Sequence, residues 1–460
     1  MFMIAENSGI ITQILDLLSK ENIVLNRNKD LFSLVTQIRS LTDELARTII
    51  RTILQVLDHS LIESPARKRD WIIQRRNQAK TVATTLGPIT YERTYFKNRH
   101  TGEYAYLLDE QIGVTPHQRA SLDLQHSILK AAHQQSYQKT VDQHEYSGIT
   151  SKTTVMNYVH KLGGIESSEC AVPEKKKVVK RLYIEADEDH VATQRSGNQQ
   201  LKLIYVHEGR ERVGKKRHRL IHPHYFVGFY QKRSDELWFE VLTYLDANYD
   251  LDQVEEISLS GDGAAWIKGG LEVIPRSKYY LDRFHLEKYI KRAVAPVEAA
   301  KGLKADCYWM IRDALSLDDR EEFTTLIDSM MGYGLTRSSE LSVEECKKYI
   351  LNNWEGIQNT LAGGNGGCSA EGHVSHILSS RLSSRPMGWS LKGAENIARL
   401  RVFELNHGDL AGYLIAKARA AVKEKRIVKL EKRIVRKASQ YMIKQVSIND
   451  ATPHFGYYKA

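Results

Sequence analysis

Three acidic residues lie where the chain could present a carboxylate to a ligand. Asp187 follows the apolar pattern of residues 182–186, Asp262 follows that of residues 257–260, and Glu371 starts a helical pattern after a glycine-rich break. A strand holds the residue at its end in place, and the glycines beside Asp262 let a ligand backbone come close. Carboxylate oxygens suit Mg²⁺ or Mn²⁺, and two such ions can act on both sides of a scissile phosphate. The three acids therefore predict a metal-dependent reaction at a phosphodiester.

The position of the first acid is ambiguous, because Glu185, Glu188 and Asp189 surround Asp187. A strand places every second side chain on one face, so Glu185 shares a face with Asp187. Asp189 is the main alternative to Asp187 as the first metal ligand. Each acid also has an ordinary interpretation, since an aspartate after a strand often caps a turn and Glu371 suits the first turn of a helix. The order of two strand acids, a helical block and a helix acid favours the catalytic interpretation.

The elements that must position these acids follow from the periodicity of the apolar residues. A helical block without a strand pattern, residues 292–360, separates the second acid from the third, and a helix is expected over residues 234–245. Near the start of the chain we expect helices over about 8–75 and hairpin strands over 81–108. Around the first two acids, strands are expected at 182–186, 201–207, 225–230, 257–260 and 279–281.

Several motifs around the acids form a recognisable set. They are Leu-Tyr-Ile-Glu-Ala-Asp-Glu-Asp-His-Val at 182–191, Ser-Gly-Asp-Gly-Ala at 260–264, Tyr-Leu-Asp-Arg-Phe-His at 280–285, Glu-Gly-His-Val-Ser-His at 371–376 and Arg-Pro-Met-Gly-Trp-Ser at 385–390. This set resembles the DDE transposases with an RNase H-like catalytic domain. More narrowly, it resembles the ISLre-type transposases of bacterial insertion sequences, which are related to the Mutator-like group. Segments 87–91 and 107–110 share the resemblance, so it spans most of the chain.

The resemblance implies roles for the site residues. Asp187, Asp262 and Glu371 would hold Mg²⁺ or Mn²⁺, and His285 would lie near the scissile phosphate, with Asp282 fixing its turn. The implied reaction is hydrolysis at the ends of a mobile DNA element, followed by attack of the freed 3′-hydroxyl on target DNA. Because two ends must be joined in one event, a homo-oligomer on double-stranded DNA is expected. A buried histidine between strand and helix is the ordinary alternative for His285.

The composition agrees with a nucleic-acid partner. The chain has 460 residues, a net charge of +10 and a pI of about 9.1, and such an excess of positive charge favours polyanions. No apolar stretch reaches the roughly 18 residues of a membrane span. The N-terminus has no signal-peptide pattern, and none of the four cysteines forms a Cys-x-x-Cys pair. These features predict a protein of the bacterial cytoplasm, associated with the nucleoid and not with a membrane.

Residues 136–162 have the pattern of a helix-turn-helix. Gly148 suits the tight turn, Ile149 would fill the space between the helices, and Thr150 or Ser151 can cap the last helix. The outward face of that helix would meet the major groove. An ordinary helical hairpin is the alternative. The predicted recognition residues are Lys152, Thr153, Asn157 and Lys161, and the predicted inward ones are Val155, Val159 and Leu162.

Two basic regions and two tryptophans complete the predicted DNA contacts. A basic hairpin over residues 209–220, with Lys215, Lys216 and Arg217, would help phosphates approach the acidic site, although a solvated loop is the alternative. A basic helix is expected over 411–445, where it could contact phosphate or dock on a partner subunit. Trp266 and Trp389 lie near the acids in sequence and could stack on an unpaired base; packing in the core is the alternative.

The predicted fold class is a multidomain α+β protein. It joins a helical N-terminal region and a helix-turn-helix to an RNase H-like mixed-sheet catalytic domain with an α-helical insertion. The predicted parts are a helical region at 1–80, a β-hairpin region at 81–115, the helix-turn-helix at 116–165, the catalytic domain at 178–292 and 363–405, the insertion at 293–362 and the basic helix at 406–460.

Other functions were weighed against this one. A catalytically inactive DNA-binding protein derived from a transposase is the main alternative. His207-x-x-Arg210 matches a tyrosine-recombinase pattern, but it ends a strand where that pattern requires a helix. His218, His222 and His224 suggest zinc, but the proline between the last two argues against the helix that would align them.

Overall fold

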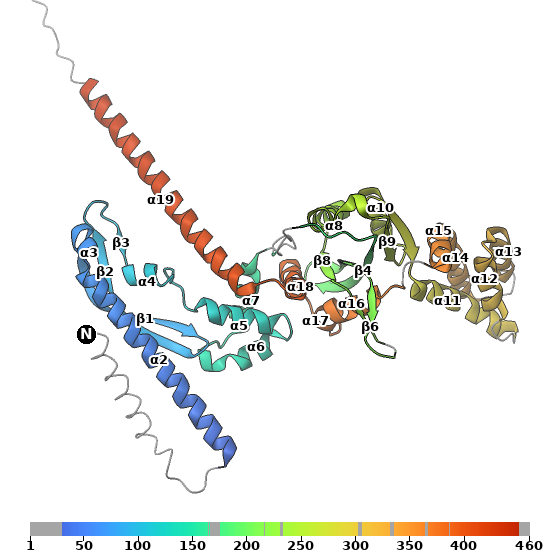
Figure 1. The fold of residues 1–460 in the computed structure, drawn as a ribbon, viewed down its shortest axis with the longest axis horizontal. Helices are drawn as coiled ribbons and strands as arrows, with labels where there is room; N and C mark the ends of the chain where they lie inside the picture. The colour runs from blue at the N-terminus through green and yellow to red at the C-terminus, as the bar shows by residue number, and fades with distance from the viewer. Residues whose placement is uncertain are drawn as a thin grey trace, which may run out of the picture. The chain divides into compact units, whose positions relative to one another are not determined.

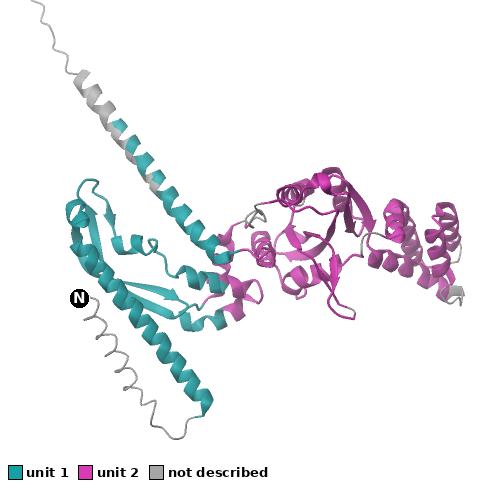
Figure 2. Cartoon of the chain, in the orientation of Figure 1, with its two compact units in different colours: residues 1–128, 141–150, 409–460 teal, residues 129–140, 151–408 magenta. Residues whose placement is uncertain are grey.

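The computed structural model describes two compact units, each considered by itself (Figures 1 and 2). The first comprises residues 1–128, 141–150 and 409–460, and the second comprises residues 129–140 and 151–408. No described helix is both long enough and apolar enough to cross a membrane. The described residues are 30–163, 165, 175–215, 217–230, 233–301, 306–331, 335–363, 367–385 and 387–449.

The first unit contains a three-stranded antiparallel sheet in the order β1-β2-β3. A tight turn at Gly87, with φ of 100°, joins the first two strands. The core of the unit includes Leu54, Val82, Tyr91 and Leu108. Its elements are α2 (Leu31–Glu63), α3 (Pro65–Asp70), β1 (Trp71–Thr84), β2 (Gly87–Asn98), β3 (Tyr104–Ala105), α4 (Leu107–Gln111) and α19 (Leu410–Asn449). The last of these confirms the predicted C-terminal helix.

The first strand begins ten residues earlier than the sequence predicted. We expected helix up to residue 75, but β1 starts at Trp71. Most side chains of its first half are exposed, so the polar–apolar alternation that identifies a strand is missing there. Its pairing with β2 is also irregular between Ile73 and Gln78, where Asn77 has a positive φ of 54°. The predicted helix residues 8–29 lie outside the described part of the chain.

The elements of the predicted helix-turn-helix are present as local structure. Gly148 has a left-handed φ of 80°, and the Ser151 hydroxyl accepts a hydrogen bond from the Thr153 backbone N–H. The boundary between the two units passes through this segment, so its function as a DNA reader stays a prediction. The elements are α5 (Leu122–Ala132), α6 (Tyr137–Gln143), η1 (Glu145–Ser147) and α7 (Lys152–Leu162). On α7, Val155, Val159 and Leu162 are buried, while Lys152, Thr153, Asn157 and Lys161 are exposed.

The second unit is built on a five-stranded mixed sheet in the order β10-β9-β4-β5-β8. β5 runs antiparallel to β4 and β8, whereas β4, β9 and β10 are parallel. The strands are β4 (Arg181–Thr193), β5 (Gly197–His207), β8 (His224–Gly228), β9 (Glu256–Gly261) and β10 (Ser277–Leu281). All five lie where the sequence predicted strands.

β4 is longer than predicted, so Asp187 lies inside the strand and not beyond its end. The antiparallel ladder with β5 continues to the pair Thr193 and Gly197. Carboxylates do not interrupt such a ladder, because it uses only backbone groups. The apolar run at the start of β4 therefore marked only part of the strand.

The two faces of β4 differ in chemistry. Leu182, Ile184 and Ala186 belong to the main core, on the face packed by α8 (Ser234–Asn248). Alternation places Glu185, Asp187 and Asp189 on the opposite face, where all three are buried. That face is covered by the helical run of α16 (Ala370–Val374), the π-helical turn η4 (Ser375–Ser379) and α17 (Ser380–Leu382), and β8 is covered by α18 (Leu391–Leu405). Three buried acids of β4 therefore lie in a row on this face of the sheet.

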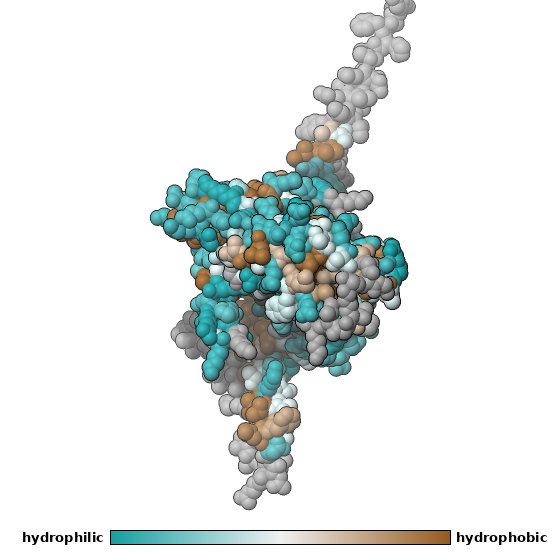
Figure 3. Space-filling view, turned by 90° about the vertical axis from the view of Figure 1, so that its right-hand side faces the viewer, coloured by the Kyte–Doolittle hydropathy of each residue, from teal (hydrophilic) through white to brown (hydrophobic). Residues whose placement is uncertain are grey.

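A helical block follows β10, as predicted, and its described residues contain no strand. Thr360 donates a hydrogen bond from its hydroxyl to the Leu281 carbonyl at 2.9 Å, which attaches the block to the sheet. The face of the molecule at this end is mainly hydrophilic, with scattered apolar side chains (Figure 3). The helices are α11 (Arg283–Lys301), α12 (Asp306–Ser316), α13 (Arg320–Met331), α14 (Arg337–Asn352) and α15 (Trp354–Ala362).

Candidate active site

Three aspartates lie level with one another across neighbouring parallel strands. Glu185 of β4 pairs with Ser260 of β9, so Asp187 and Asp262 each follow that pair by two positions. Gly261 pairs with Leu281 of β10, so Asp262 and Asp282 each come next. The Asp282 N–H donates to the Gly261 carbonyl at 2.8 Å. Since neighbouring strands are about 5 Å apart, the register gathers these side chains at the level where β9 and β10 end.

Asp187 is the electrostatic centre of this group. Burial raises the pKa of its carboxyl, and the charges of Asp262 and Glu371 raise it further. A hydrogen bond from the Glu188 N–H, at 2.8 Å, and the charge of His285 oppose that rise. The net result is a pKa of about 7. The fold therefore keeps acids from distant parts of the chain close enough to repel one another, and a cation would relieve that repulsion.

The helical block holds the turn that carries Asp262. The Tyr349 hydroxyl donates to the Asp262 carbonyl oxygen at 2.6 Å, and the Asp262 carboxylate accepts from the Ala264 N–H at 2.9 Å. Gly263 has a φ of 98°, and a Cβ there would lie 2.7 Å from Oδ1 of Asn353. Tyr349 on α14 and Asn353 between α14 and α15 were not identified from the sequence, because they lie about ninety residues from Asp262 and Gly263 and belong to no distinctive motif.

Asp282 and His285 form a local pair at the start of α11. The Asp282 carboxylate accepts from the Phe284 N–H at 3.2 Å and lies 2.8 Å from Nδ1 of His285. This hydrogen bond raises the pKa of His285 above its ordinary value, burial opposes that rise, and the charges of Asp262 and Asp187 add to it. Asp282 therefore orients the imidazole and favours its protonated form beside the acids.

The third predicted acid is only partly gathered into the site. Glu371 is exposed in the first turn of α16, although its charge acts on Asp187. Among the described residues, no three His, Cys, Asp or Glu side chains are grouped closely enough to hold a metal ion. Asp189, the alternative first ligand, accepts a hydrogen bond from the Ser383 hydroxyl at 2.9 Å.

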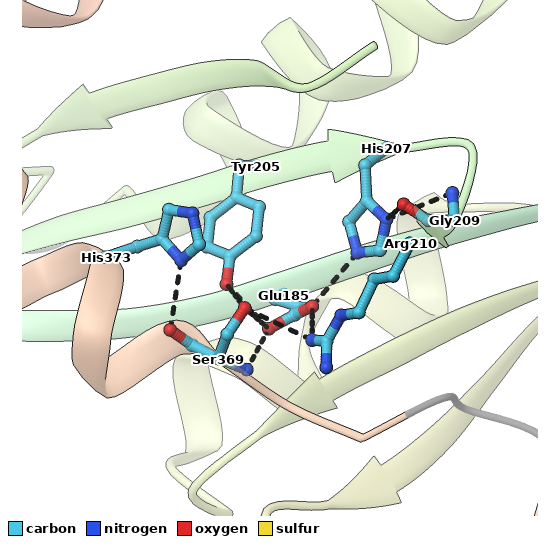
Figure 4. Close-up of polar contacts among 7 residues, drawn as sticks. All are labelled: Glu185, Tyr205, His207, Gly209, Arg210, Ser369 and His373. Carbon is cyan, nitrogen blue, oxygen red and sulfur yellow. Dashed lines mark hydrogen bonds and ion pairs between the residues drawn. The ribbon is translucent and has the colours of Figure 1, made fainter. Parts of the chain in front are cut away.

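A second buried acid organises the same face of the sheet (Figure 4). We call this group the Glu185 cluster. The Glu185 carboxylate accepts from the Tyr205 hydroxyl at 2.6 Å and lies 2.9 Å from Nε2 of His207. It also pairs with the Arg210 guanidinium and accepts from the backbone N–H of Ser369. The cluster comprises Glu185, Tyr205, His207, Arg210, Ser369 and His373, whose Nδ1 lies 3.0 Å from the Ser369 carbonyl oxygen.

The partners of Glu185 keep it ionised despite its burial. Burial raises the pKa of the carboxyl, but the hydrogen bond from His207, the charge of Arg210 and the hydrogen bond from Tyr205 outweigh it, so the pKa lies well below its usual value. In the sequence, His207 and Arg210 stand out only as a chance match to a recombinase pattern. In the structure, His207 at the end of β5 and Arg210 at the start of β6 both contact Glu185.

The remaining predicted contact residues occupy varied environments. Trp389 is buried, and its Nε1 donates a hydrogen bond to the Leu382 carbonyl at 3.0 Å. These contacts favour packing in the core over stacking on a base. Trp266 is half-buried against Trp238 and donates to the Glu188 carboxylate. Lys215 and Arg217 are exposed in the hairpin of β6 (Arg210–Arg212) and β7 (His218–Leu220). Lys216 lies outside the described residues.

Comparisons with known proteins give the following similarities. The model of an uncharacterised protein family, UPF0236, matches residues 25–418. Two UPF0236 proteins of Caldanaerobacter subterraneus subsp. tengcongensis are each 37% identical over 393 residues, which cover 84% of this chain and 80% of theirs. The name of one joins eleven loci of that genome, and the name of the other joins four.

A solved structure shows a much lower similarity. The Drosophila P element transposase strand transfer complex is 11% identical, with a TM-score of 0.25, and the match covers 65% of this chain and 82% of that one. A similarity at this level carries no argument about fold or function.

Proposed function

The chain belongs to the UPF0236 family, and we propose that it is a DNA transposase that cuts and joins strands at the ends of a mobile element. Its site would contain Asp187, Asp262 and Glu371. More narrowly, we propose an ISLre-type insertion-sequence transposase related to the Mutator-like group. Its partners would be double-stranded DNA and further copies of this chain, and its location would be the nucleoid.

The observation that carries the proposal is the shared level of Asp187 and Asp262 on neighbouring parallel strands. The two acids are 75 positions apart in the sequence, yet strand pairing places half-buried Asp262 at the level of buried Asp187. The order β10-β9-β4-β5-β8, with β5 the antiparallel strand, supports an RNase H-like sheet. In an RNase H-like sheet, the first strand along the chain is central and the fourth lies next to it. β4 and β9 are the first and fourth strands of this sheet along the chain, and they have these positions.

The donor set fits a hard divalent cation. Asp187 and Asp262 supply carboxylate oxygens, and burial, together with the charges of Asp262 and Glu371, raises the pKa of Asp187. Bound Mg²⁺ or Mn²⁺ would activate the attacking oxygen and stabilise the leaving oxygen. Glu371, on the exposed side of α16, would complete the set by a small movement when DNA binds. Asp189 is a less suitable first ligand because it lies two positions beyond the level that Asp187 shares with Asp262 on the neighbouring strand.

Other residues of the chain would position the DNA. Protonated His285, oriented by Asp282, would donate a hydrogen bond to an oxygen of the scissile phosphate. The basic hairpin would offset the repulsion between phosphates and the acids. The exposed residues Lys152, Thr153, Asn157 and Lys161 of α7 would read the element ends, and α19 would contribute positive charge.

The repetition of relatives within one genome also supports a mobile element. A protein named from eleven loci is present in many copies, and copying within a genome is what a transposase does for its own gene. The alternative, an inactive DNA-binding derivative, is favoured by one observation. The described part of the structure has no assembled group of three metal ligands.

Strand cleavage tests the proposal directly. Supercoiled DNA with the ends that flank the gene should be nicked with Mg²⁺ or Mn²⁺, and should not be nicked in EDTA. D187N and D262N should lower the rate by ~10³-fold or more, the scale seen when members of a catalytic group are removed. D246N is the matched control, because Asp246 is an exposed acid on α8 that pairs with Lys176.

The outcomes separate the alternatives. Specific binding to the ends without nicking would favour the inactive derivative. A covalent protein–DNA adduct on a suicide substrate would support a tyrosine recombinase and overturn the metal-dependent reaction. Unchanged nicking by D262N would overturn the proposed site.

A further inference from the structure

A pocket of about 710 Å³ lies between the β6–β7 hairpin and the start of the α16 helical run. It is separate from the row of acids but shares residues with the Glu185 cluster. Arg210, Ser369 and His373 belong to both, and Figure 4 shows their polar contacts within the cluster. The other lining residues are Val213, Arg217, His218, Arg219, Leu220, Pro223 and Tyr225. The volume is within the range of pockets that hold a small molecule or one nucleotide.

The lining of the pocket is suited to an anion. Three arginines and two histidines contribute to it, and none of its described lining residues is acidic. Arg210 is balanced by Glu185, and Arg219 pairs with Glu211. Arg217 is exposed at the tip side of the hairpin. The pocket therefore offers an anion the exposed guanidinium of Arg217, whereas the charge of Arg210 is balanced by Glu185.

The inner wall of the pocket is suited to a flat ring. His373 and Tyr225 both line it, with ring centroids 5.9 Å apart. Nδ1 of His373 lies 3.0 Å from the Ser369 carbonyl oxygen, which can only accept, so the proton is on Nδ1. In the neutral ring Nε2 is then an acceptor, able to receive a hydrogen bond from an N–H group of a base, such as N3–H of thymine.

Glu371, a proposed metal ligand, leaves α16 on the side opposite the pocket. Ser369 and His373 are four positions apart, one helical turn, and both face the pocket. Glu371 lies midway between them, so its side chain leaves the other side of α16. A DNA strand that reaches the proposed metal site would therefore find the basic pocket on the opposite side of α16.

We propose that this pocket binds one unpaired nucleotide of the DNA strand that is cut, with its phosphate at Arg217 and its base at His373. The inference rests on the proposed function for the identity of the ligand. It adds a recognition step, because only a strand opened at the element end offers such a nucleotide. Stacking on a ring and contact with a guanidinium are the usual means of holding an unpaired base.

Binding in EDTA isolates this inference from cleavage. The probe is fluorescein-labelled oligothymidylate, with a blunt duplex as the comparison and fluorescence anisotropy as the readout. H373A should weaken binding of oligothymidylate by roughly 5- to 100-fold, the range for loss of one stacked base. It should change binding of the blunt duplex by less than about 2-fold, since duplex binding depends mainly on phosphate contacts.

Salt dependence tests the phosphate contact separately. R217A should lower the slope of log K against log salt by about 0.7 for a single strand. R320A, which removes an exposed arginine on α13, should leave the slope unchanged. Because Arg217 is exposed, R217A should fold normally even if H373A does not.

Cross-linking identifies the bound surface. Oligothymidylate that contains 4-thiothymidine should cross-link within residues 210–225 or 369–373. Cross-links elsewhere, or wild-type affinity in both H373A and R217A, would overturn the pocket. Because D187N D262N should retain this binding, a failure of strand cleavage and a failure of the pocket are distinguishable.

Discussion

The Glu185 carboxylate of β4 accepts a hydrogen bond from the backbone N–H of Ser369, although 184 residues separate the two along the chain. Ser369 directly precedes α16 and is two positions before Glu371. Glu185 is two positions before Asp187 on the same face of β4. The bond therefore joins the segment of the third proposed ligand to the strand of the first. The oxygens of Glu185 are already occupied by Tyr205, His207, Arg210 and Ser369, so Glu185 is not one of the proposed metal ligands.

Removal of the Glu185 charge should destabilise the protein. E185Q leaves Arg210 and His207 next to a neutral group in a buried site, and loss of one member of a buried ion pair usually costs about 3–5 kcal/mol. Chemical denaturation followed by circular dichroism measures the change. The matched control is E255Q, whose exposed pair with Lys180 should contribute at most about 1 kcal/mol. If E185Q and E255Q have the same denaturation midpoint, the Glu185 charge does not stabilise the fold.

Metal binding should stabilise the wild-type protein and not the proposed ligand variants. A cation bound only by the folded state adds about 2.7 kcal/mol at a concentration of 100 times Kd. Mn²⁺ should therefore raise the Tm of the wild type and have little effect on D187N. In EDTA, D187N should be at least as stable as the wild type, because it removes a carboxylate whose charge is disfavoured by burial and by repulsion from neighbouring acids. Equal Mn²⁺ shifts in both proteins would contradict the ligand assignment.

The backbone at Gly263 should tolerate no side chain. G263A places a Cβ at a φ of 98° and 2.7 Å from Asn353, so the free energy of unfolding should fall by about 1–3 kcal/mol. G372A is the control, since Gly372 is helical and no atom lies within 4 Å of its added Cβ. That change should be neutral or stabilise by up to about 1 kcal/mol. Thermal unfolding compares the two, and a greater loss in G372A would refute this account.

The stability of the second unit should depend on the charge of His224. Burial lowers the pKa of this imidazole to about 4, from about 6.5 in the unfolded chain. As pH falls through this window the unfolded chain gains the proton first, so stability present above pH 6.5 is lost on the way to about pH 4. The loss should reach about 3 kcal/mol.

H224F should remove this pH dependence. The phenyl ring can keep the stack on Tyr244, whose ring lies 3.9 Å away, but it cannot take a proton. Denaturation of both proteins between pH 7 and about pH 4 gives the comparison. As pH falls, the wild type should lose more of its unfolding free energy than H224F does. If the two plots of unfolding free energy against pH are parallel, His224 is not the titrating group.

Sequence patterns were sufficient for the elements whose signal is local. The five strands of the sheet and the helical block have regular apolar spacing, and the Ser151 cap depends on neighbours only two positions apart. The polar first half of β1 was missed because its pairing with β2, and not its own burial pattern, makes it a strand.

The sequence by itself determined which residue types could do chemistry and on which kind of element each lies. Only the tertiary structure decided which of them meet. Strand register set Asp187, Asp262 and Asp282 at one level, and the return of the chain after the helical block brought Ser369 to Glu185. Such contacts join residues that are tens to hundreds of positions apart, and periodicity within one element carries no information about them.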